Sequence, residues 1–202
     1  MARMHTDDNG LGATLAPQRS RMARRAGLAV AVMAALAAAL YLLRVPLVVA
    51  LVPQLAAHRL AIDTAATVPD GLHVGLCGTG SPFPDEHRAG PCTLVLAGKR
   101  LFVFDSGSGA ARTIGKMGFN AGQIEAIFLT HFHSDHIDRL GELLLQRWVA
   151  SANRSPAPVH GPPGVAQVID GLMLAYRQDQ AYRVAHHGDA IIPASGFGAQ
   201  VL

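Results

Sequence analysis

Apolar residues are unevenly distributed along the chain, and their pattern divides it into two unlike parts. Residues 26–43 are 18 uncharged, mostly apolar residues in a row. As a helix they would extend about 27 Å, close to the thickness of the hydrocarbon core of a bilayer. From about Gly71 onward, short apolar runs alternate with glycine-rich turns and polar stretches. We therefore expect one long apolar helix followed by a folded domain.

The second part of the chain predicts strands that alternate with helices. Short apolar runs bounded by glycine or polar turns predict strands, whereas apolar residues three or four positions apart predict helices. Such alternation indicates an α/β layered domain. The expected strands cover residues 73–79, 93–98, 100–105, 123–130 and 157–160, and the expected helices cover 110–117, 137–150 and 165–177.

The apolar segment 26–43 is interpreted as an uncleaved membrane anchor. Four arginines lie within residues 19–25, directly before it. By the positive-inside rule, the N-terminus stays in the cytoplasm and the domain lies on the extracytoplasmic, periplasmic side. A cleaved signal peptide and an internal buried helix are the alternatives.

A second apolar stretch follows the anchor. It covers residues 45–57, and its two prolines, Pro46 and Pro53, predict that it is broken and too short to span the bilayer again. We expect it to lie at the membrane interface. The expected domains are a basic cytoplasmic tail (1–25), the transmembrane anchor (26–43), an interfacial segment and linker (44–70), and a partial catalytic domain (71–202).

The positive net charge belongs to the tail and not to the folded domain. The whole chain carries +3, yet the 177 residues after residue 25 hold 12 basic and 12 acidic side chains. A protein that grips a nucleic-acid backbone normally presents a basic surface on its folded part. Nucleic acid is therefore not the favoured partner.

The chain contains two cysteines, Cys77 and Cys92, and neither belongs to a C-x-x-C pair. A structural zinc site built from cysteine is therefore not indicated. Two free, buried thiols are the favoured interpretation. A disulfide is the alternative if the domain is exported, because both cysteines lie near neighbouring predicted strands.

One short segment concentrates the candidate chemistry. His131, His133, Asp135 and His136 follow a predicted strand directly and precede a predicted helix. Side chains two apart on an extended segment point the same way, so the first two histidines can bind one metal together. The aspartate and the last histidine follow where the chain turns, and they can face a second metal. The alternative is a solvated, histidine-rich loop without metal.

Imidazole and carboxylate ligands suit zinc, and manganese or iron can occupy such a site as well. Two metals held in this way can bind a bridging water, lower its pKa and present hydroxide to a carbonyl, phosphorus or sulfur centre. Asp135 is also a candidate catalytic residue, because it can accept or relay a proton.

The H-x-H-x-D-H segment after an apolar strand resembles the signature of the metallo-β-lactamase fold family. The resemblance covers about residues 72–190 and points to the branch with ribonuclease Z and arylsulfatase-type hydrolases. It implies an αββα sandwich, of which this chain holds the N-terminal half. Four further segments agree with it in order and context: Gly78 to Pro82, Arg88 to Cys92, Phe104 to Gly109, and Gly161 to Gly164.

The resemblance also implies roles for individual residues. His131 and His133 match ligands of a first zinc, and Asp135 and His136 match ligands of a second. Asp105 matches an aspartate that lies behind the metals and orients their ligands. An aspartate that only caps a turn is the alternative for Asp105.

The chain departs from the family pattern beyond these residues. The family supplies a third histidine for the first zinc, a bridging aspartate and a final histidine, and no segment up to Leu202 resembles them. His186 and His187 are not favoured as substitutes. We therefore expect a fragment of a longer reading frame, with one face of its sheet exposed.

The leading hypothesis is a zinc-dependent hydrolase of an ester or phosphodiester bond. A small-molecule carboxylic, sulfate or phosphate ester, or a lactone, fits an exported neutral domain better than RNA does. The alternative is a catalytically incomplete fragment or a membrane-anchored metal-binding module without activity.

Overall fold

The computed structural model describes residues 16–60 and 63–202, so the first 15 residues of the expected basic tail lie outside the described residues. Contacts between residues divide the chain between Ala57 and His58 into two units.

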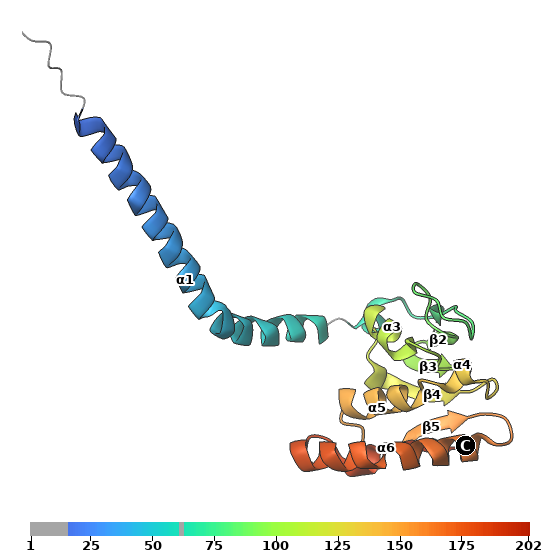
Figure 1. Ribbon diagram of the computed structural model, residues 1–202. Coiled ribbons are helices and arrows are strands. Elements are labelled where there is room, and N and C mark those ends of the chain that lie inside the picture. The colour runs from blue at the N-terminus through green and yellow to red at the C-terminus, as the bar shows by residue number, and fades with distance from the viewer. Residues whose placement is uncertain (1–15, 61–62) are drawn as a thin grey trace, which may run out of the picture. The chain divides into compact units, whose positions relative to one another are not determined.

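The first unit is built around one helix, α1 (Ala16–Leu60), which passes through Pro46 and Pro53. The expectation that these prolines break the second apolar stretch is therefore wrong. Figure 1 shows that α1 bends where its colour passes from blue to teal and then continues. A proline removes one backbone hydrogen bond and bends a helix, but the remaining bonds can carry the helix onward. The span Arg21–Leu55 is apolar enough to cross a membrane, with a mean hydropathy of 2.3 in its most apolar window.

The second unit contains a six-stranded sheet in the order β1-β2-β3-β4-β5-β6. The first three strands pair antiparallel, whereas β3 to β6 pair parallel. Every strand that the sequence predicts is present, and β6 was not predicted. The strands are β1 (Leu72–Gly78), β2 (Cys92–Ala97), β3 (Arg100–Phe104), β4 (Ile124–Phe128), β5 (Ala157–His160) and β6 (Ala199–Val201).

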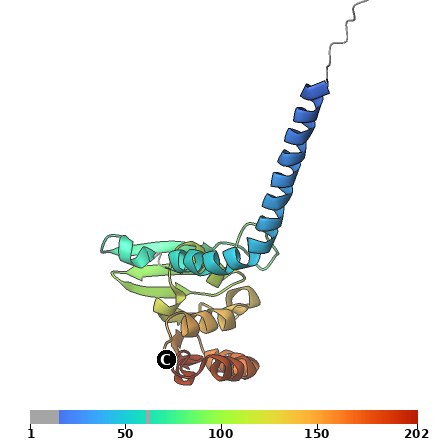
Figure 2. The ribbon, with the colours of Figure 1, turned by 90° about the vertical axis from the view of Figure 1, so that its left-hand side faces the viewer.

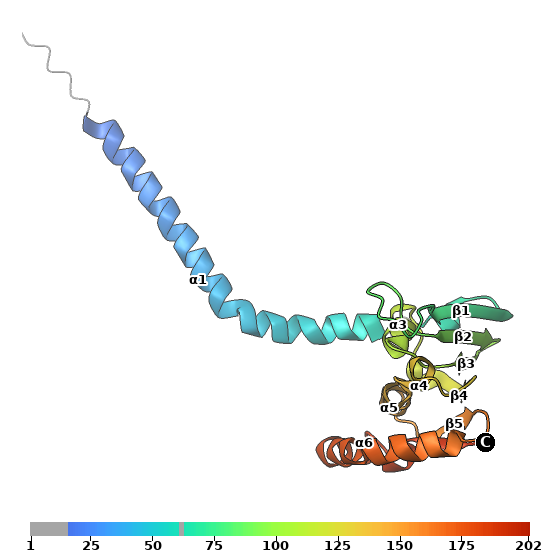
Figure 3. The ribbon, with the colours of Figure 1, turned by 45° about the vertical axis from the view of Figure 1, so that its right-hand side comes forward.

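Helices α3, α5 and α6 lie on one side of this sheet, as Figure 3 shows with the strands stacked from β1 to β5. Figures 1 and 2 agree that α6 lies at the end of the unit farthest from β1. The helical elements of the unit are α2 (Thr64–Thr67), α3 (Ala110–Lys116), α4 (Ser134–Ile137), α5 (Leu140–Ala150) and α6 (Val165–His187), with short 3-10 turns η1 (Ala121–Gln123) and η2 (Ala194–Gly196).

Two predicted helix boundaries are wrong. The helix expected over 137–150 begins at Leu140, because the backbone N–H of Arg139 donates to the carbonyl of Ser106 (3.1 Å) and a separate turn, α4, precedes it. The helix expected to end near residue 177 continues to His187, where Gly188 caps it with a φ of 81°.

The two faces of the sheet differ in burial. The helix-covered face is the core, with Leu94, Leu96, Leu101 and Val103 at most 1% exposed. The opposite face carries apolar side chains that remain exposed, and those of β1 are 64–72% exposed. This open face agrees with the expectation of a sheet covered on one side only. Its exposed β1 side chains are Leu72, Val74 and Leu76.

Cys77 and Cys92 form a disulfide, so the favoured interpretation of two free thiols is wrong and the alternative is correct. A β-bulge between Leu76 and Gly78 brings the cysteines together, because Gly78 pairs with Cys92 one step after the shift in register. Both cysteines are buried. The two thiols could not be paired from the sequence because the bulge is not visible in the alternation of residues.

Candidate metal centre

The four predicted ligands lie at the carboxyl ends of the parallel strands. The sheet ladder continues past β3 and β4, where the N–H of Asp105 donates to Phe128 (2.8 Å) and that of Leu129 donates to His160 (2.8 Å). The side chains that follow these two strands therefore meet at one edge. Such an edge is the common position of ligand sites in parallel sheets.

Asp105 is the buried anchor of this edge. It is 6% exposed and has a φ of 61°, a conformation that aspartate and asparagine tolerate better than most residues. Its Oδ1 accepts the N–H of Thr130 (2.8 Å), and its Oδ2 accepts the hydroxyl of Thr130 (2.8 Å) and Nδ1–H of His136 (2.8 Å). The carboxylate thus orients a predicted ligand, as the resemblance implies, and does more than cap a turn.

These hydrogen bonds set the tautomers of two histidines. Because Oδ2 of Asp105 accepts from His136 Nδ1, the lone pair of that ring lies on Nε2. The Thr130 hydroxyl donates to Asp105, so it accepts from Nδ1 of His131 (3.0 Å) and leaves the lone pair of His131 on its Nε2 as well. The acceptor nitrogen of each ring is therefore Nε2, and that of His131 accepts Nδ1–H of His133 (3.0 Å).

The predicted ligands come together as two pairs. Nε2 of His131 lies 3.0 Å from Nδ1 of His133, and Nε2 of His136 lies 3.7 Å from Oδ2 of Asp135. Two ligand atoms that share a tetrahedral zinc ion are roughly 3.3 Å apart. The rings of His131 and His136 are 4.1 Å apart between centroids, so the two pairs are neighbours.

The donor atoms in each pair therefore fit a divalent cation, but they supply only two ligands each. Within residues 16–60 and 63–202, no three His, Cys, Asp or Glu side chains form a group arranged to hold a metal ion. A complete zinc site has three or four protein ligands. The described residues thus hold only part of the candidate metal centre.

The short helix α4 carries the second pair. Asp135 and His136 lie in its only turn, and the His136 carbonyl accepts the N–H of Ser106 (2.8 Å). Just after α4, partial burial raises the pKa of the Asp138 carboxyl; the Arg139 guanidinium opposes this shift, and the carboxylates of Asp135 and Glu142 add to it. Carboxylates and a cation therefore both lie beside this turn.

Thr130 is a candidate site residue that the sequence analysis missed. Its hydroxyl and N–H bind Asp105, and the hydroxyl also binds Nδ1 of His131. The sequence does contain a signal for it, because Thr130 is a hydrogen-bonding residue that lies between the end of a predicted strand and the first predicted ligand, His131. His186 and His187, which were not favoured as ligands, are exposed at the end of α6, and their rings meet edge to face with centroids 4.6 Å apart.

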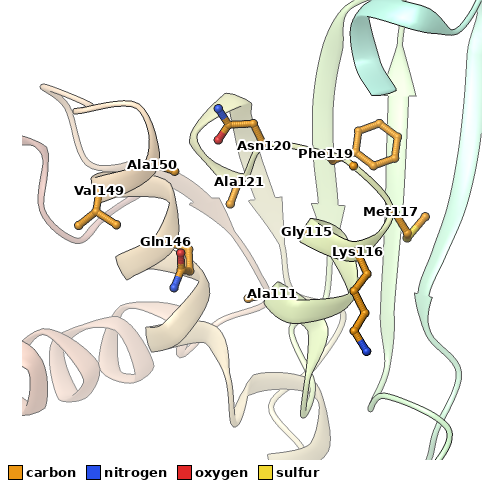
Figure 4. A pocket seen from close by; sticks show the side chains of 11 residues that line it. Ala111, Gly115, Lys116, Met117, Phe119, Asn120, Ala121, Gln146, Val149 and Ala150 are labelled. Atoms are coloured by element: carbon orange, nitrogen blue, oxygen red, sulfur yellow. The ribbon is translucent and has the colours of Figure 1, made fainter. Parts of the chain in front are cut away.

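A surface hollow of about 670 Å³ lies between α3, the turn at η1 and α5 (Figure 4). Lys116 is its one charged lining residue, and none of the predicted metal ligands lines it. The hollow and the histidine cluster are therefore separate features.

Comparison with known proteins decides the family. The model of the metallo-beta-lactamase superfamily matches residues 86–196, which is more than half of the chain and includes all four predicted ligands. The chain belongs to the metallo-beta-lactamase superfamily. The fold class that the sequence predicted is thereby confirmed at this level.

Relatives within the metallo-beta-lactamase superfamily carry the name ribonuclease Z. One from Mycolicibacterium gilvum is 47% identical over 124 residues, which is 60% of this chain and 43% of the relative. One from Mycobacterium bovis is 45% identical over 124 residues, or 44% of its length. The chain therefore spans less than half the length of these curated relatives. Among solved structures, human tRNase Z short form is 30% identical with a TM-score of 0.47, covering 52% of this chain and 39% of that one.

Proposed function

We propose that this chain carries part of the metal site of a phosphodiester hydrolase of the ribonuclease Z type. The observation that supports it is the tautomer arrangement at the cluster, in which Asp105 and Thr130 bind Nδ1–H of His136 and of His131, so that the acceptor nitrogen of each ring is the Nε2 that faces the other predicted ligand of its pair. Hydrogen bonds of this kind fix the tautomer and the orientation of metal-binding histidines. The names of the relatives supply the type of bond.

Zinc is the proposed cation, held by His131 and His133 as one pair and by Asp135 and His136 as the other. When bound, such an ion lowers the pKa of a coordinated water and stabilises developing negative charge. Asp135 presents Oδ2 toward His136, so its other oxygen is available to accept a proton from an attacking water. Asp105 holds His136 in the tautomer that this arrangement needs.

RNA replaces small esters as the proposed substrate class. The sequence analysis favoured carboxylic, sulfate or phosphate esters because the domain is neutral after residue 25. Relatives with 45–47% identity over 124 residues are named ribonuclease Z. Net charge reports on the strength of backbone binding and carries no information on the bond that is cleaved.

The test compares substrates with the purified chain in zinc. Hydrolysis of bis(p-nitrophenyl) phosphate and of an RNA with a 3′ extension should exceed that of p-nitrophenyl acetate and p-nitrophenyl sulfate. His133→Ala should abolish the phosphodiester activity, and the matched control His186→Ala should retain it. Faster cleavage of the acetate or sulfate ester would refute the substrate class.

A second function, a metal-binding module without activity, is supported by the absence of a three-ligand group in the described residues. The same assay separates the two candidates. A chain that binds zinc through His133 but cleaves none of the four substrates is the module. A chain that cleaves the phosphodiester is the enzyme.

We also propose that α1 anchors the domain to a membrane with the metal centre on the extracytoplasmic side. Its apolar side chains are exposed, for example Leu36 and Leu40, and the arginines of residues 19–25 precede them. The Cys77–Cys92 disulfide suits an oxidising compartment. Length and composition also admit a signal sequence near the N-terminus.

A C-terminal reporter tests this placement. Fusion to alkaline phosphatase, which is active only after export, should give activity in the membrane fraction, while fusion to green fluorescent protein should stay dark. The opposite pair of results would place the domain in the cytoplasm. Activity in the soluble exported fraction would identify a cleaved signal peptide.

A further inference from the structure

The disulfide closes the base of the connection between β1 and β2. Cys77 precedes the last residue of β1, and Cys92 is the first residue of β2. The two are 15 positions apart in sequence and at most 2% exposed. Neither the sequence pattern nor the proposed reaction assigns a role to this disulfide. Its role can be inferred from the backbone contacts of the residues next to Cys77 and Cys92.

Immediately beyond the disulfide, backbones lie in direct contact. A Cβ on Gly78 would collide with the carbonyl of Gly90, so the backbone segments at these two residues lie closer together than a side chain at Gly78 would allow. Gly90 donates its N–H to Ser108 (2.8 Å), and Gly107 donates its N–H to the carbonyl of Pro91 (3.0 Å). The residues next to Cys92 are therefore bonded twice to the loop that follows β3.

That second loop supports the Asp135–His136 ligand pair. The N–H of Ser106 donates to the carbonyl of His136 (2.8 Å), and a Cβ on Gly107 would collide with the carbonyl of Asp135. A short path thus runs from Cys92 through Pro91, Gly107 and Ser106 to His136. The His131–His133 pair is oriented by a different route, through the side chain of Thr130.

We propose that the Cys77–Cys92 disulfide is a positioning device for the Asp135–His136 ligand pair. It holds Gly90 and Pro91 in place, and they hold the 106–108 loop against α4. The consequence for metal binding rests on the proposed function, whereas the consequence for the loop does not. Loss of the bond loosens one ligand pair and leaves the other unchanged.

The first test uses the metal-free full chain in detergent and measures amide hydrogen exchange. In Cys77→Ala/Cys92→Ala, the amides of Ser106 and Gly107 should exchange faster on the order of 10-fold. The amide of Leu129, which bonds to His160 at the other side of the cluster, should be unchanged. Equal acceleration at all three amides would show a global loss of stability and overturn the proposal, as would no acceleration.

The second test measures zinc affinity by chelator competition in two backgrounds. In His133→Ala, which leaves the Asp135–His136 pair intact, removal of the disulfide should weaken binding about 10-fold, the lower end of the effect of residues that orient ligands. In His136→Ala it should change binding less than about twofold. Equal weakening in both backgrounds would overturn the proposal.

Two controls complete the design. Ile114→Val lowers stability in α3, away from the ligands, and should leave zinc affinity unchanged in either background. If the alanine pair does not fold, Cys77→Val/Cys92→Ala restores buried volume without the bond and takes its place. A wild-type chain that binds no zinc contradicts the proposed function, and the exchange measurement then decides the positioning role alone.

Discussion

Replacement of Asp105 by asparagine removes one charge from the centre of the metal-ligand network and leaves its shape almost unchanged. The backbone at this position has a φ of 61°, and asparagine adopts that conformation as readily as aspartate does. The substitution therefore reports on the side-chain hydrogen bonds without adding backbone strain.

The magnitude follows from the three donors that the carboxylate accepts, each at 2.8 Å. An amide offers one oxygen and one NH₂ group. If its oxygen stands at the Oδ2 position, it keeps the Thr130 hydroxyl and His136 but turns a donor toward the Thr130 N–H. One unsatisfied donor and the lost charge on two bonds cost about 2–4 kcal/mol. Because Thr130 is exposed to water, we expect the lower end of this range, about 2 kcal/mol.

Urea unfolding of the metal-free chain measures this cost through Trp148, the one tryptophan in the sequence, which is fully buried. Zinc affinity, measured by chelator competition, should fall about 10- to 100-fold because His136 loses its orientation. The matched control is Asp179→Asn, the same chemical change in the partly exposed ion pair of Asp179 with Arg183, which should cost less than about 1 kcal/mol and leave zinc binding unchanged.

A second pair of variants tests the role of the Thr130 hydroxyl. Thr130→Val removes the hydroxyl that joins Asp105 to His131, whereas Thr130→Ser keeps it. If Asp105→Asn and Thr130→Val both leave zinc affinity within about twofold of the wild type, Asp105 is a structural turn residue and the reasoning about tautomers is refuted.

Three further predictions follow from the packing. Gly107→Ala should destabilise the domain by about 3 kcal/mol or more, because the new Cβ would meet three backbone atoms. Gly115→Ala has open space around it and should stabilise α3 by about 0.5–1 kcal/mol. Equal urea midpoints for the two variants would contradict this. Arg147→Met removes two hydrogen bonds from a buried guanidinium to backbone carbonyls (2.8 and 3.0 Å) and should cost about 3 kcal/mol in urea unfolding, with an unchanged midpoint as the contrary result. Trp148→Phe removes the indole N–H donor to Pro193 (2.6 Å) and should lower the free energy of unfolding, followed by circular dichroism, by about 1–2 kcal/mol; a loss below about 0.3 kcal/mol would show that the bond contributes nothing.

Local pattern was sufficient to predict most of the fold. The strands β1 to β5 follow from apolar runs bounded by glycine, because such a run has few other ways to bury itself. Family membership followed from spacing, since His131, His133 and His136 keep a fixed order after an apolar strand. Helix ends were predicted less well, because Arg139 donates to a distant carbonyl that no local rule contains.

Pairing across the chain was the part that the sequence left open. Cys77 and Cys92 lie within one short stretch, yet a bulge decides whether their sulfurs meet. The behaviour of Pro46 and Pro53 was open for a related reason, because a proline that bends a helix and one that ends it look the same in a sequence.

The sequence by itself determined the α/β class, and it predicted the position of the candidate metal-ligand segment and its four donors, because these depend on residue type and short-range spacing. Only the tertiary structure decided which ring nitrogen of His131 and His136 donates a hydrogen bond and which one accepts. That choice depends on Asp105, which is 25 residues from Thr130 and 31 from His136 along the chain and reaches both only because β3 and β4 are neighbours in the sheet. Hydrogen bonds at such separations follow from strand order, and strand order is a property of the folded chain as a whole.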